Sequence, residues 1–357
     1  MTTPASLVLV LGAGASKEVN LPLGSELKGK ISKLLNFELD DFGRISGGDQ
    51  RFRECLHRLA QSTLASGSID DYFQAAHTVH GAMPLAPSID NFIDSHRTNP
   101  RIAEVGKLAI TLCILRAEKN SKLYVNQSNS YNKPNFTGLA GTWFNALFGI
   151  LFQHCSWEGI DDRFSRLAII SFNYDRCALH FFREALRTYY NVQPHEVDRV
   201  VSKISIYYPY GSVGPMRFQT EGSGIDFGEQ PMPDDLIKYS QQLKTFTEST
   251  DESASEIASI RTAIRSSKAL VFLGFAFHPL NMKLLYGEDR PVPGYDAGDV
   301  FGTAMGISES DVSVISNQLR IFGGYTENRI RLRRDLAAAS LVSEYSRHLA
   351  HAVHAAA

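Results

Sequence analysis

Two short segments contain the residues of this chain that could do chemistry. The first is Gly12-Ala13-Gly14-Ala15-Ser16, which follows an apolar run and precedes a helical pattern. Glycines at this position let the backbone turn tightly and approach a pyrophosphate, and the N-terminus of the next helix stabilises its charge. Ser16 adds a hydroxyl donor. The segment therefore predicts a nucleotide phosphate site, and a plain tight β–α turn is the alternative interpretation.

The second segment is Ser171-Phe172-Asn173-Tyr174-Asp175, at the end of another apolar run. Polar side chains at the carboxyl edge of a buried sheet are costly unless they bind something. Asp175 can cap a helix that begins at Arg176, which is an ordinary structural role. Asn173 has no evident capping role, so we expect it to contact a ligand.

Two better-known nucleotide motifs do not fit the sequence. After Gly12 and Gly14, a dehydrogenase fingerprint needs a third glycine where Lys17 stands, and an acidic ribose ligand about 20 residues later on a second strand. The segment Gly24–Ile31 matches G-x-x-x-x-G-K but has Ile31 where a magnesium ion needs a hydroxyl. We therefore expect neither hydride transfer nor a P-loop, and we expect Gly24–Ile31 to form an amphipathic helix.

The composition excludes several classes of protein. Of the 357 residues, 43% are hydrophobic and 21% are charged, which is typical of a globular chain. Lys and Arg (36) nearly balance Asp and Glu (38), so the net charge of −2 predicts no direct nucleic-acid binding. No apolar run approaches the roughly 20 residues that span a bilayer. We expect no membrane association, no signal peptide, because no Lys or Arg precedes the first apolar run, and a cytoplasmic location.

The cysteines give no sign of a metal site or of a disulfide framework. They are Cys55, Cys113, Cys155 and Cys177. No two of them form a C-x-x-C pair, which a zinc ribbon would need. Cys177 and His180 are three residues apart, but no four-ligand spacing accompanies them. We therefore predict that the chain holds no metal.

Four segments have the continuous apolar character of strands that are buried on both faces of a parallel sheet. They are Ser6–Leu11, Leu167–Phe172, Lys203–Tyr207 and Ala269–Leu273. Helical patterns separate them, so we predict an α/β fold with a doubly wound, Rossmann-like parallel sheet. Ligands of such sheets lie at the carboxyl ends of the strands. The loops that begin at Gly12, Asn173, Tyr208 and Gly274 should therefore surround the site.

The long stretch between the first two strands predicts an inserted module. Its segments Ser68-Ile69-Asp70 and Ser88-Ile89-Asp90 each begin with a serine followed by acidic residues, as a capped helix N-terminus does. We expect a core over residues 1–290, in which 20–150 are largely this helical module, and a helical C-terminal extension over 291–357. Its arginines are expected on a solvated helix face, or else at an interface with an acidic partner or a second copy of the chain; they are Arg329, Arg331, Arg333 and Arg334.

Together these segments resemble the SIR2 (sirtuin-like) family. Gly12–Ser16 matches the G-A-G-x-S nucleotide loop of the family, and Ser171–Asp175 matches its T-x-N-x-D element. Gly211 falls where the family has His-Gly, and Val271–Phe275 is similar to its late strand–glycine segment. The order of these motifs and their strand placement are more specific than any one motif alone. The resemblance covers the four predicted strands, roughly half of the chain.

The resemblance implies an SIR2 core that binds NAD with the nicotinamide ribose beside Asn173. Deacetylases of the family carry a four-cysteine zinc module, which this sequence lacks. The helical insertion and the segment His278-Pro279-Leu280-Asn281 look more like the bacterial SIR2-like NAD hydrolases of anti-phage defence. One departure is Tyr210, which occupies the histidine position of the family. A tyrosine, with a pKa of about 10, is a poor general base at neutral pH.

The carried-over site has two parts. The expected catalytic residues are Asn173, Asp175, Tyr208, Tyr210 and His278. The expected NAD-binding residues are Gly12, Ala13, Gly14, Ala15, Ser16, Gly211, Gly274, Phe275 and Asn281. Either tyrosine could contact the ribose, and His278 could replace the missing imidazole if its loop reaches that far.

The resemblance implies an NAD⁺ glycohydrolase that releases nicotinamide and ADP-ribose. NAD is then the substrate and no metal is needed, because the cationic nicotinamide leaves readily and the enzyme mainly orients the ribose and stabilises an oxocarbenium-like transition state. Such an enzyme is expected to be a triggered, NAD-depleting effector that acts as a homo-oligomer or with a partner defence protein. The alternative is a non-catalytic SIR2-like module that binds NAD and acts through a partner, which Tyr210 favours.

Overall fold

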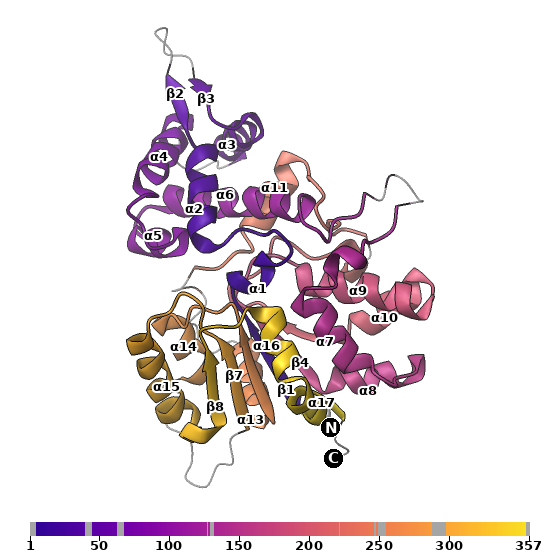
Figure 1. Cartoon of the computed structure of the whole chain (residues 1–357). Coiled ribbons are helices and arrows are strands. Elements are labelled where there is room, and N and C mark those ends of the chain that lie inside the picture. Colours follow the sequence, from indigo (N-terminus) through magenta and orange to yellow (C-terminus); the bar gives the residue numbers. More distant parts are fainter. Residues whose placement is uncertain are drawn as a thin grey trace.

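The centre of the molecule is a six-stranded sheet in the order β5-β4-β1-β6-β7-β8, in which all neighbouring strands are parallel (Figure 1). The structure is a computed structural model and describes residues 5–39, 45–62, 68–126, 128, 132–220, 222–245, 248, 255–287 and 298–354. The strands are β1 (Leu7–Leu11), β4 (Leu167–Ser171), β5 (Ser205–Tyr207), β6 (Ala269–Leu273), β7 (Asp299–Thr303) and β8 (Ile330–Arg333). This sheet, with helices on both faces, confirms the predicted Rossmann-like α/β class.

The four predicted strands are confirmed, with ends that differ by at most two residues. Alternate side chains of β1 enter two separate cores, which explains why the strand is apolar throughout. Leu7, Leu9 and Leu11 pack with α7 (Trp143–Phe152), α16 (Ala338–Glu344) and α17 (Ser346–His354). Val8 and Val10 pack on the other face with α13 (Ser255–Ser266), α14 (Pro279–Tyr286) and α15 (Glu309–Gly323). The first core also includes α8 (Ile160–Ser165), α9 (Cys177–Tyr190) and α10 (Pro194–Val201).

The prediction of a helical extension beyond residue 291 is wrong for two segments. Asp299–Thr303 and Ile330–Arg333 are strands β7 and β8, which complete the sheet beyond β6. The sequence signal of β8 is weak because it is an edge strand whose four residues are all half-buried, so charged and apolar side chains alternate. Arg331 and Arg333 therefore lie on a strand, not on a solvated helix face. They form ion pairs with Asp299 (3.2 Å) and Asp335 (2.7 Å).

A helical module lies above the carboxyl edge of the sheet (Figure 1). Its central helix is α6 (Pro100–Lys119), which packs against the others. These are α2 (Gly24–Leu34), α3 (Gln50–Ser62), α4 (Ile69–Ala82), α5 (Ile89–Ser95) and, from the segment after β5, α11 (Pro233–Ser240). A short hairpin joins α2 to α3 and consists of β2 (Phe37–Leu39) and β3 (Ile45–Gly47). Because α7 packs over the sheet, the insertion ends before Trp143 and not at residue 150.

Several local predictions in this module are confirmed. Gly24–Ile31 lies in α2 and buries Leu27 and Ile31, as an amphipathic helix does. The side chains of Ser68 and Ser88 accept hydrogen bonds from backbone N–H groups at the starts of α4 and α5. The remaining short helices are α1 (Ala13–Lys17) and the 3-10 turns Thr137–Leu139, Trp157–Gly159, Arg217–Gln219 and Glu327–Arg329. Within the ranges given above, no helix is both long enough and apolar enough to cross a membrane.

Candidate functional site

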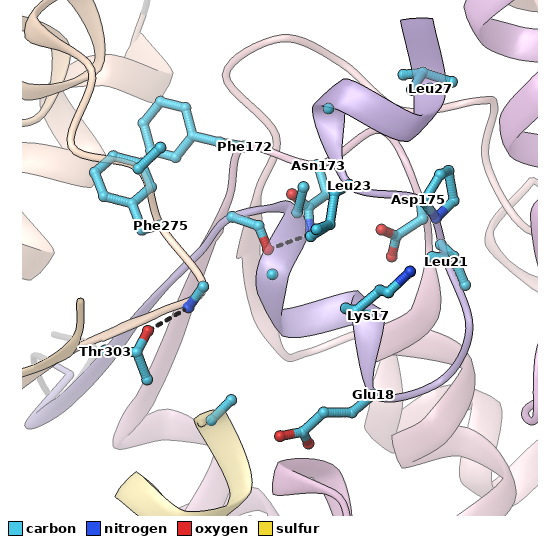
Figure 2. Close-up of a pocket in the computed structure, with 18 of the residues that line it drawn as sticks. Lys17, Glu18, Leu21, Leu23, Leu27, Phe172, Asn173, Asp175, Phe275 and Thr303 are labelled. Carbon is cyan, nitrogen blue, oxygen red and sulfur yellow. Dashed lines mark hydrogen bonds between the residues drawn. The ribbon is translucent and has the colours of Figure 1, made fainter. Parts of the chain in front are cut away.

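A cavity of about 740 Å³ lies at the carboxyl edge of the sheet, lined both by sheet loops and by the helical module (Figure 2). The loops that follow β1, β4, β6 and β7 contribute to it, as do α2, α5 and α6. It therefore lies where the strand order reverses between β1 and β6, the position at which doubly wound sheets bind their ligands. Its volume is within the roughly 300–1,000 Å³ that small-molecule sites occupy.

The cavity brings together most of the residues that the sequence predicts for the site. Those that line it are Gly12, Ala13, Gly14, Asn173, Asp175, Gly274, Phe275 and Asn281. Ala15 and Ser16 are buried and do not line it. Tyr208, Tyr210, Gly211 and His278 are not part of its lining either. The predicted loops that begin at Gly12, Asn173 and Gly274 thus meet at the cavity, whereas the loop after β5 does not line it.

The glycines after β1 and β6 are required by the close contact between their two loops. A Cβ on Gly14 would lie 2.7 Å from the Cα of Gly274, and a Cβ on Gly12 would lie 2.5 Å from the carbonyl oxygen of Gly274. Gly274 itself has φ +56°. The N–H groups of Gly12 and Gly14 donate to the carbonyls of Leu273 (3.0 Å) and Gly274 (3.1 Å). These two N–H groups are engaged within the protein, so loop packing is sufficient to explain the glycines.

Asn173 links the two loops that the sequence singles out. Its side-chain Nδ2 donates to the carbonyl oxygen of Gly12 (3.0 Å) and to Oγ of Ser16 (3.2 Å), and the residue is only 9% exposed (Figure 2). A backbone carbonyl can only accept a hydrogen bond, so the contact with Gly12 fixes which end of the amide faces inward. The carbonyl oxygen Oδ1 of Asn173 is then the atom left to accept a hydrogen bond from a ligand in the cavity.

Asp175 combines a structural role with a place in the cavity. Its Oδ1 accepts a hydrogen bond from the N–H of Cys177 (3.0 Å), the first residue of α9, so Asp175 does bond to the start of the helix, although the N-cap position is Arg176 and the helix begins one residue later than predicted. Burial raises the pKa of the Asp175 carboxyl above its usual range, while the hydrogen bonds from Cys177 and Ser16 act in the opposite direction. Asp175 is thus a buried carboxyl that holds its proton more tightly than an exposed one.

The loop after β5 packs behind the cavity. Tyr210 is 6% exposed, and its hydroxyl donates to Oδ1 of the cavity residue Asn281 (2.5 Å). Gly211 has φ +75°, and a Cβ there would lie 2.5 Å from the carbonyl oxygen of Gln242. Burial, together with the charge of Asp175, raises the pKa of Tyr208, which therefore stays a neutral phenol. Tyr210 therefore contacts the cavity residue Asn281 and does not line the cavity itself.

His278 has a local role at the start of α14. Its Nδ1 accepts a hydrogen bond from the N–H of Leu280 (3.4 Å), which makes it the N-cap residue of that helix. His278 therefore does not replace the family histidine at the cavity, because it does not line it. No histidine is present among the residues that line the cavity in the described part of the chain.

Lys17, Phe172 and Asp90 also line the cavity and are outside the predicted site, whereas Phe275 is one of the predicted residues. Lys17 lies at the cavity, with its ammonium group 2.5 Å from Glu26 and with a half-exposed side chain. The rings of Phe172 and Phe275, with centroids 5.1 Å apart, form an apolar wall on the side opposite Lys17 and Asp175 (Figure 2). The sequence contains a hint of the position of Lys17, because this residue follows the glycine loop directly and stands where a dehydrogenase has its third glycine. Asp90, which also lines the cavity, comes from the helical module.

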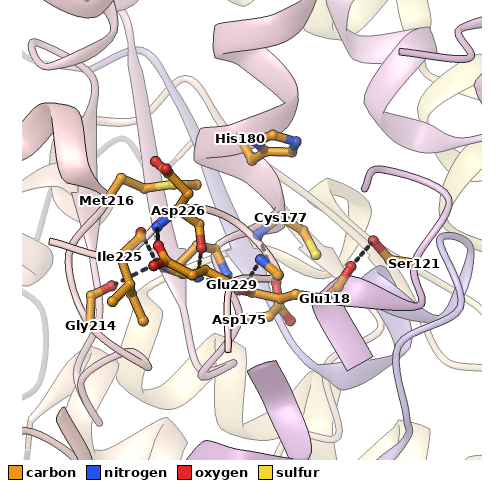
Figure 3. A network of polar contacts seen from close by, with 12 residues as sticks. Glu118, Ser121, Asp175, Cys177, His180, Gly214, Met216, Ile225, Asp226 and Glu229 are labelled. Carbon is orange, nitrogen blue, oxygen red and sulfur yellow. Dashed lines mark hydrogen bonds and ion pairs between the residues drawn. The ribbon is translucent and has the colours of Figure 1, made fainter. Parts of the chain in front are cut away.

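A buried ion pair anchors the β4 loop to the helical module. Arg176 is 1% exposed and Glu118, at the end of α6, is fully buried; their closest charged atoms are 2.5 Å apart. Arg176 also donates to the carbonyls of Gly214 (3.4 Å), Ile225 (2.9 Å) and Asp226 (3.2 Å). Figure 3 shows this network. Every guanidinium nitrogen has an acceptor, as a buried charge needs, so the network fixes the loop that carries Asn173 and Asp175.

No family model, no curated protein and no solved structure matches this chain. In the described ranges the cysteines are unpaired thiols, and no group of three or more His, Cys, Asp or Glu side chains is arranged to hold a metal ion.

Proposed function

We propose that this chain is an NAD⁺ glycohydrolase with an SIR2-like site, in which the cavity binds NAD and Asn173 acts at the nicotinamide ribose. The observation that carries the proposal is the position of Asn173, which is buried, lines the cavity at the carboxyl end of β4 and is tied to the β1 loop. Since Nδ2 of Asn173 is engaged with Gly12 and Ser16, we expect its Oδ1 to accept a hydrogen bond from a ribose hydroxyl or from the attacking water.

The lining of the cavity suits a ligand that combines a planar ring with a negatively charged group, as NAD does. Phe172 and Phe275 offer an apolar surface for a planar ring. Lys17 offers a positive charge for the pyrophosphate, and its exposed ion pair with Glu26 is weak enough to be exchanged for that contact. Phosphate recognition thus rests on Lys17, because the N–H groups of Gly12, Gly14 and Ala15 already donate within the protein.

The reaction needs one bond to break and one to form. The bond between C1′ of the ribose and N1 of nicotinamide breaks, and its electron pair neutralises the positive nitrogen. The oxygen of a water molecule bonds to C1′ and loses a proton to solvent, so that nicotinamide, ADP-ribose and a proton are the products. Asn173 would orient the water or the ribose, and the carboxyl groups of the cavity would stabilise the developing positive charge on the sugar when ionised.

The alternative function is a non-catalytic NAD-binding module that acts through a partner protein. It is favoured by one observation: Tyr210 stands at the family histidine position, and its hydroxyl is engaged with Asn281. Neither Tyr210 nor His278 lines the cavity.

Incubation of the purified protein with NAD⁺, followed by measurement of free nicotinamide and ADP-ribose, separates the two functions. The hydrolase predicts both products in equal amounts, and Asn173→Ala should abolish them. Tight NAD binding in calorimetry, without either product even after addition of candidate triggers, would favour the sensor.

The biological part of the proposal comes from the resemblance alone. It is a triggered effector that depletes NAD in bacterial anti-phage defence, located in the cytoplasm, and active as a homo-oligomer or with a partner defence protein. Infection assays with cells that carry the parent protein or Asn173→Ala test it, because protection should require the intact asparagine.

A further inference from the structure

We propose that Asp90, which the helical module brings to the cavity, is the residue that recognises the cis-diol of the nicotinamide ribose. This inference rests on the proposed function and adds a substrate-recognising residue to it. Asp90 lies in the first turn of α5, and no motif of the sequence assigns it more than a helix start.

Asp90 reaches the cavity beside the β4 loop. It lines the same cavity as Asn173 and Asp175, and its Oδ1 accepts a hydrogen bond from the hydroxyl of Tyr174, the residue that follows Asn173. Tyr174 is itself 8% exposed and is held by the backbone, because its carbonyl oxygen accepts from the N–H of Val213 (3.0 Å). Asp90 is thus fixed against the loop proposed to act at the ribose.

The Asp90 carboxyl has two partners within the protein, the Tyr174 hydroxyl at Oδ1 and its own backbone N–H, and because a carboxylate can accept about four hydrogen bonds it keeps room for a ligand. Among the residues that the structure describes, Tyr174 is the one side chain that donates to Asp90, and it uses Oδ1. Asp175, the other cavity aspartate, is already committed to the N–H of Cys177. Burial raises the pKa of the Asp90 carboxyl, which is the expected behaviour of an acid placed in a site without a cationic partner. A buried carboxyl group at position 90 costs folding free energy. Binding of a ligand therefore explains the presence of an aspartate here better than a contribution to stability does.

A ribose diol is the part of NAD that such a group recognises. Two adjacent hydroxyls can donate to a carboxylate, whereas phosphates repel it and the nicotinamide ring carries a positive charge beside the sugar. Rossmann-like sheets commonly use an acidic side chain for ribose hydroxyls, supplied by the strand next to the first one. Here that neighbouring strand is β4, whose loop brings Asn173 and Asp175 to the cavity, and the Oδ1 of Asp175 already accepts from the N–H of Cys177. The acidic contact would come instead from α5 of the module.

The chain contains a matched control for this residue. Asp70 occupies the same place in Ser68-Ile69-Asp70 at the start of α4 as Asp90 does in Ser88-Ile89-Asp90 at the start of α5. Asp70 is exposed and does not line the cavity. A variant of Asp70 therefore loses the same carboxylate from the same helical position without touching the site.

The test compares NAD⁺ with analogues that lack the 2′- or the 3′-hydroxyl of the nicotinamide ribose. Dissociation constants are measured by calorimetry, and kcat and KM are measured by nicotinamide release, for the parent protein, Asp90→Asn and Asp70→Asn. The parent should bind NAD⁺ about 10- to 100-fold more tightly than at least one analogue, the range expected for a hydrogen bond to a charged group. Asp90→Asn should lose this preference, and Asp70→Asn should keep it.

The outcomes separate this inference from the proposed function. If Asp90→Asn distinguishes NAD⁺ from the analogues as well as the parent does, Asp90 does not recognise the ribose, and the NAD site stands without it. If the parent binds neither NAD⁺ nor the analogues, the proposed function fails and this inference fails with it. If Asp90→Asn does not fold, Tyr174→Phe replaces it. That variant keeps the carboxyl group but releases its orientation, so its preference for the intact ribose should fall and an unchanged preference would overturn the proposal.

Discussion

The loops after β4 and β5 are both rich in polar and aromatic residues, yet they take different places in the molecule. The β4 loop brings Asn173 and Asp175 into the cavity. The β5 loop turns Tyr210 against Asn281 and keeps Gly211 against the backbone of Gln242, outside the cavity lining. The two loops carry equally suggestive sequences, so their residue types do not decide which one serves the site.

The difference follows from the position of each strand in the sheet. β4 is the direct neighbour of β1, and the strand order reverses on the other side of β1. β5 is the outermost strand on that side, has only three residues and is partly exposed. Loops close to the reversal surround the crevice, while those at the edge of the sheet can only support it. Residues that follow an edge strand are therefore expected to support a site and not to line it.

The largest expected effect concerns the anchor of the β4 loop. Glu118→Gln leaves the charge of Arg176 buried without its counter-charge, and breaking a buried pair typically costs about 3–5 kcal/mol in the free energy of unfolding. Urea unfolding followed by circular dichroism measures this cost. Asp161→Asn is the control, because Asp161 and Lys203 form an exposed pair whose loss should cost less than about 1 kcal/mol. Equal small losses in both variants would show that the β4 loop is not anchored in this way.

The next largest effect concerns catalysis by the β4 loop. Asn173→Ala should lower the rate of nicotinamide release about 10²-fold or more, because it removes a group positioned at the reacting ribose. Folding should be affected far less, since the carbonyl of Gly12 keeps the N–H of Ala15 as a donor (2.9 Å). Asn36→Ala, which changes an exposed asparagine, should retain the parent rate. A folded Asn173→Ala protein with the parent rate would remove the β4 loop from the reaction.

A smaller effect concerns the pH dependence of stability. Burial raises the pKa of Asp175 above 3.8, so the folded protein binds this proton more tightly than the unfolded chain does. Its contribution to stability is therefore present below about pH 4 and is lost as the pH rises through the folded-state pKa, with a slope of at most about 1.4 kcal/mol per pH unit. Asp175→Asn should remove that decline and raise stability at neutral pH relative to the parent.

Urea unfolding of Asp175→Asn between pH 4 and pH 8 checks this expectation. The pKa of Asp90 is raised in the same direction, also by burial, so the double variant with Asp90→Asn should have the flatter profile. A single variant whose stability falls with pH as steeply as that of the parent would show that Asp175 does not titrate in this range.

The smallest effect is expected in the β5 loop. Tyr210→Phe removes one hydrogen bond to Asn281 and should cost about 1 kcal/mol of stability, with a change in nicotinamide release well below that of Asn173→Ala. Thermal unfolding and the product assay measure the two quantities. Tyr210→His should give no gain, because the ring at this position is buried away from the cavity lining. A clear rise in activity for Tyr210→His would mean that the β5 loop reaches the ribose after all.

The sequence by itself determined the features that depend on neighbouring residues. Continuous apolar runs predicted β1, β4, β5 and β6, because strands buried on both faces need apolar side chains throughout. Serine followed by acidic residues predicted the starts of α4 and α5, because a capping side chain bonds to an N–H group three residues away. The contact of Asp175 with the start of the next helix is also local, because its carboxyl accepts from the N–H of Cys177 two residues further on. Each of these signals is complete within one short segment.

Only the tertiary structure decided how these segments meet. The edge strand β8 was missed because a half-buried strand alternates charged and apolar residues, and its identity depends on the neighbour β7. The segments Ser68-Ile69-Asp70 and Ser88-Ile89-Asp90 are identical in sequence, yet Asp70 is exposed and Asp90 lines the cavity. Asp90 meets Tyr174 across 84 positions of the chain, and that contact is set by the packing of α5 and α6 above the sheet. Local patterns cannot encode such a distance, because they specify which face of a segment is buried and not which other segment buries it.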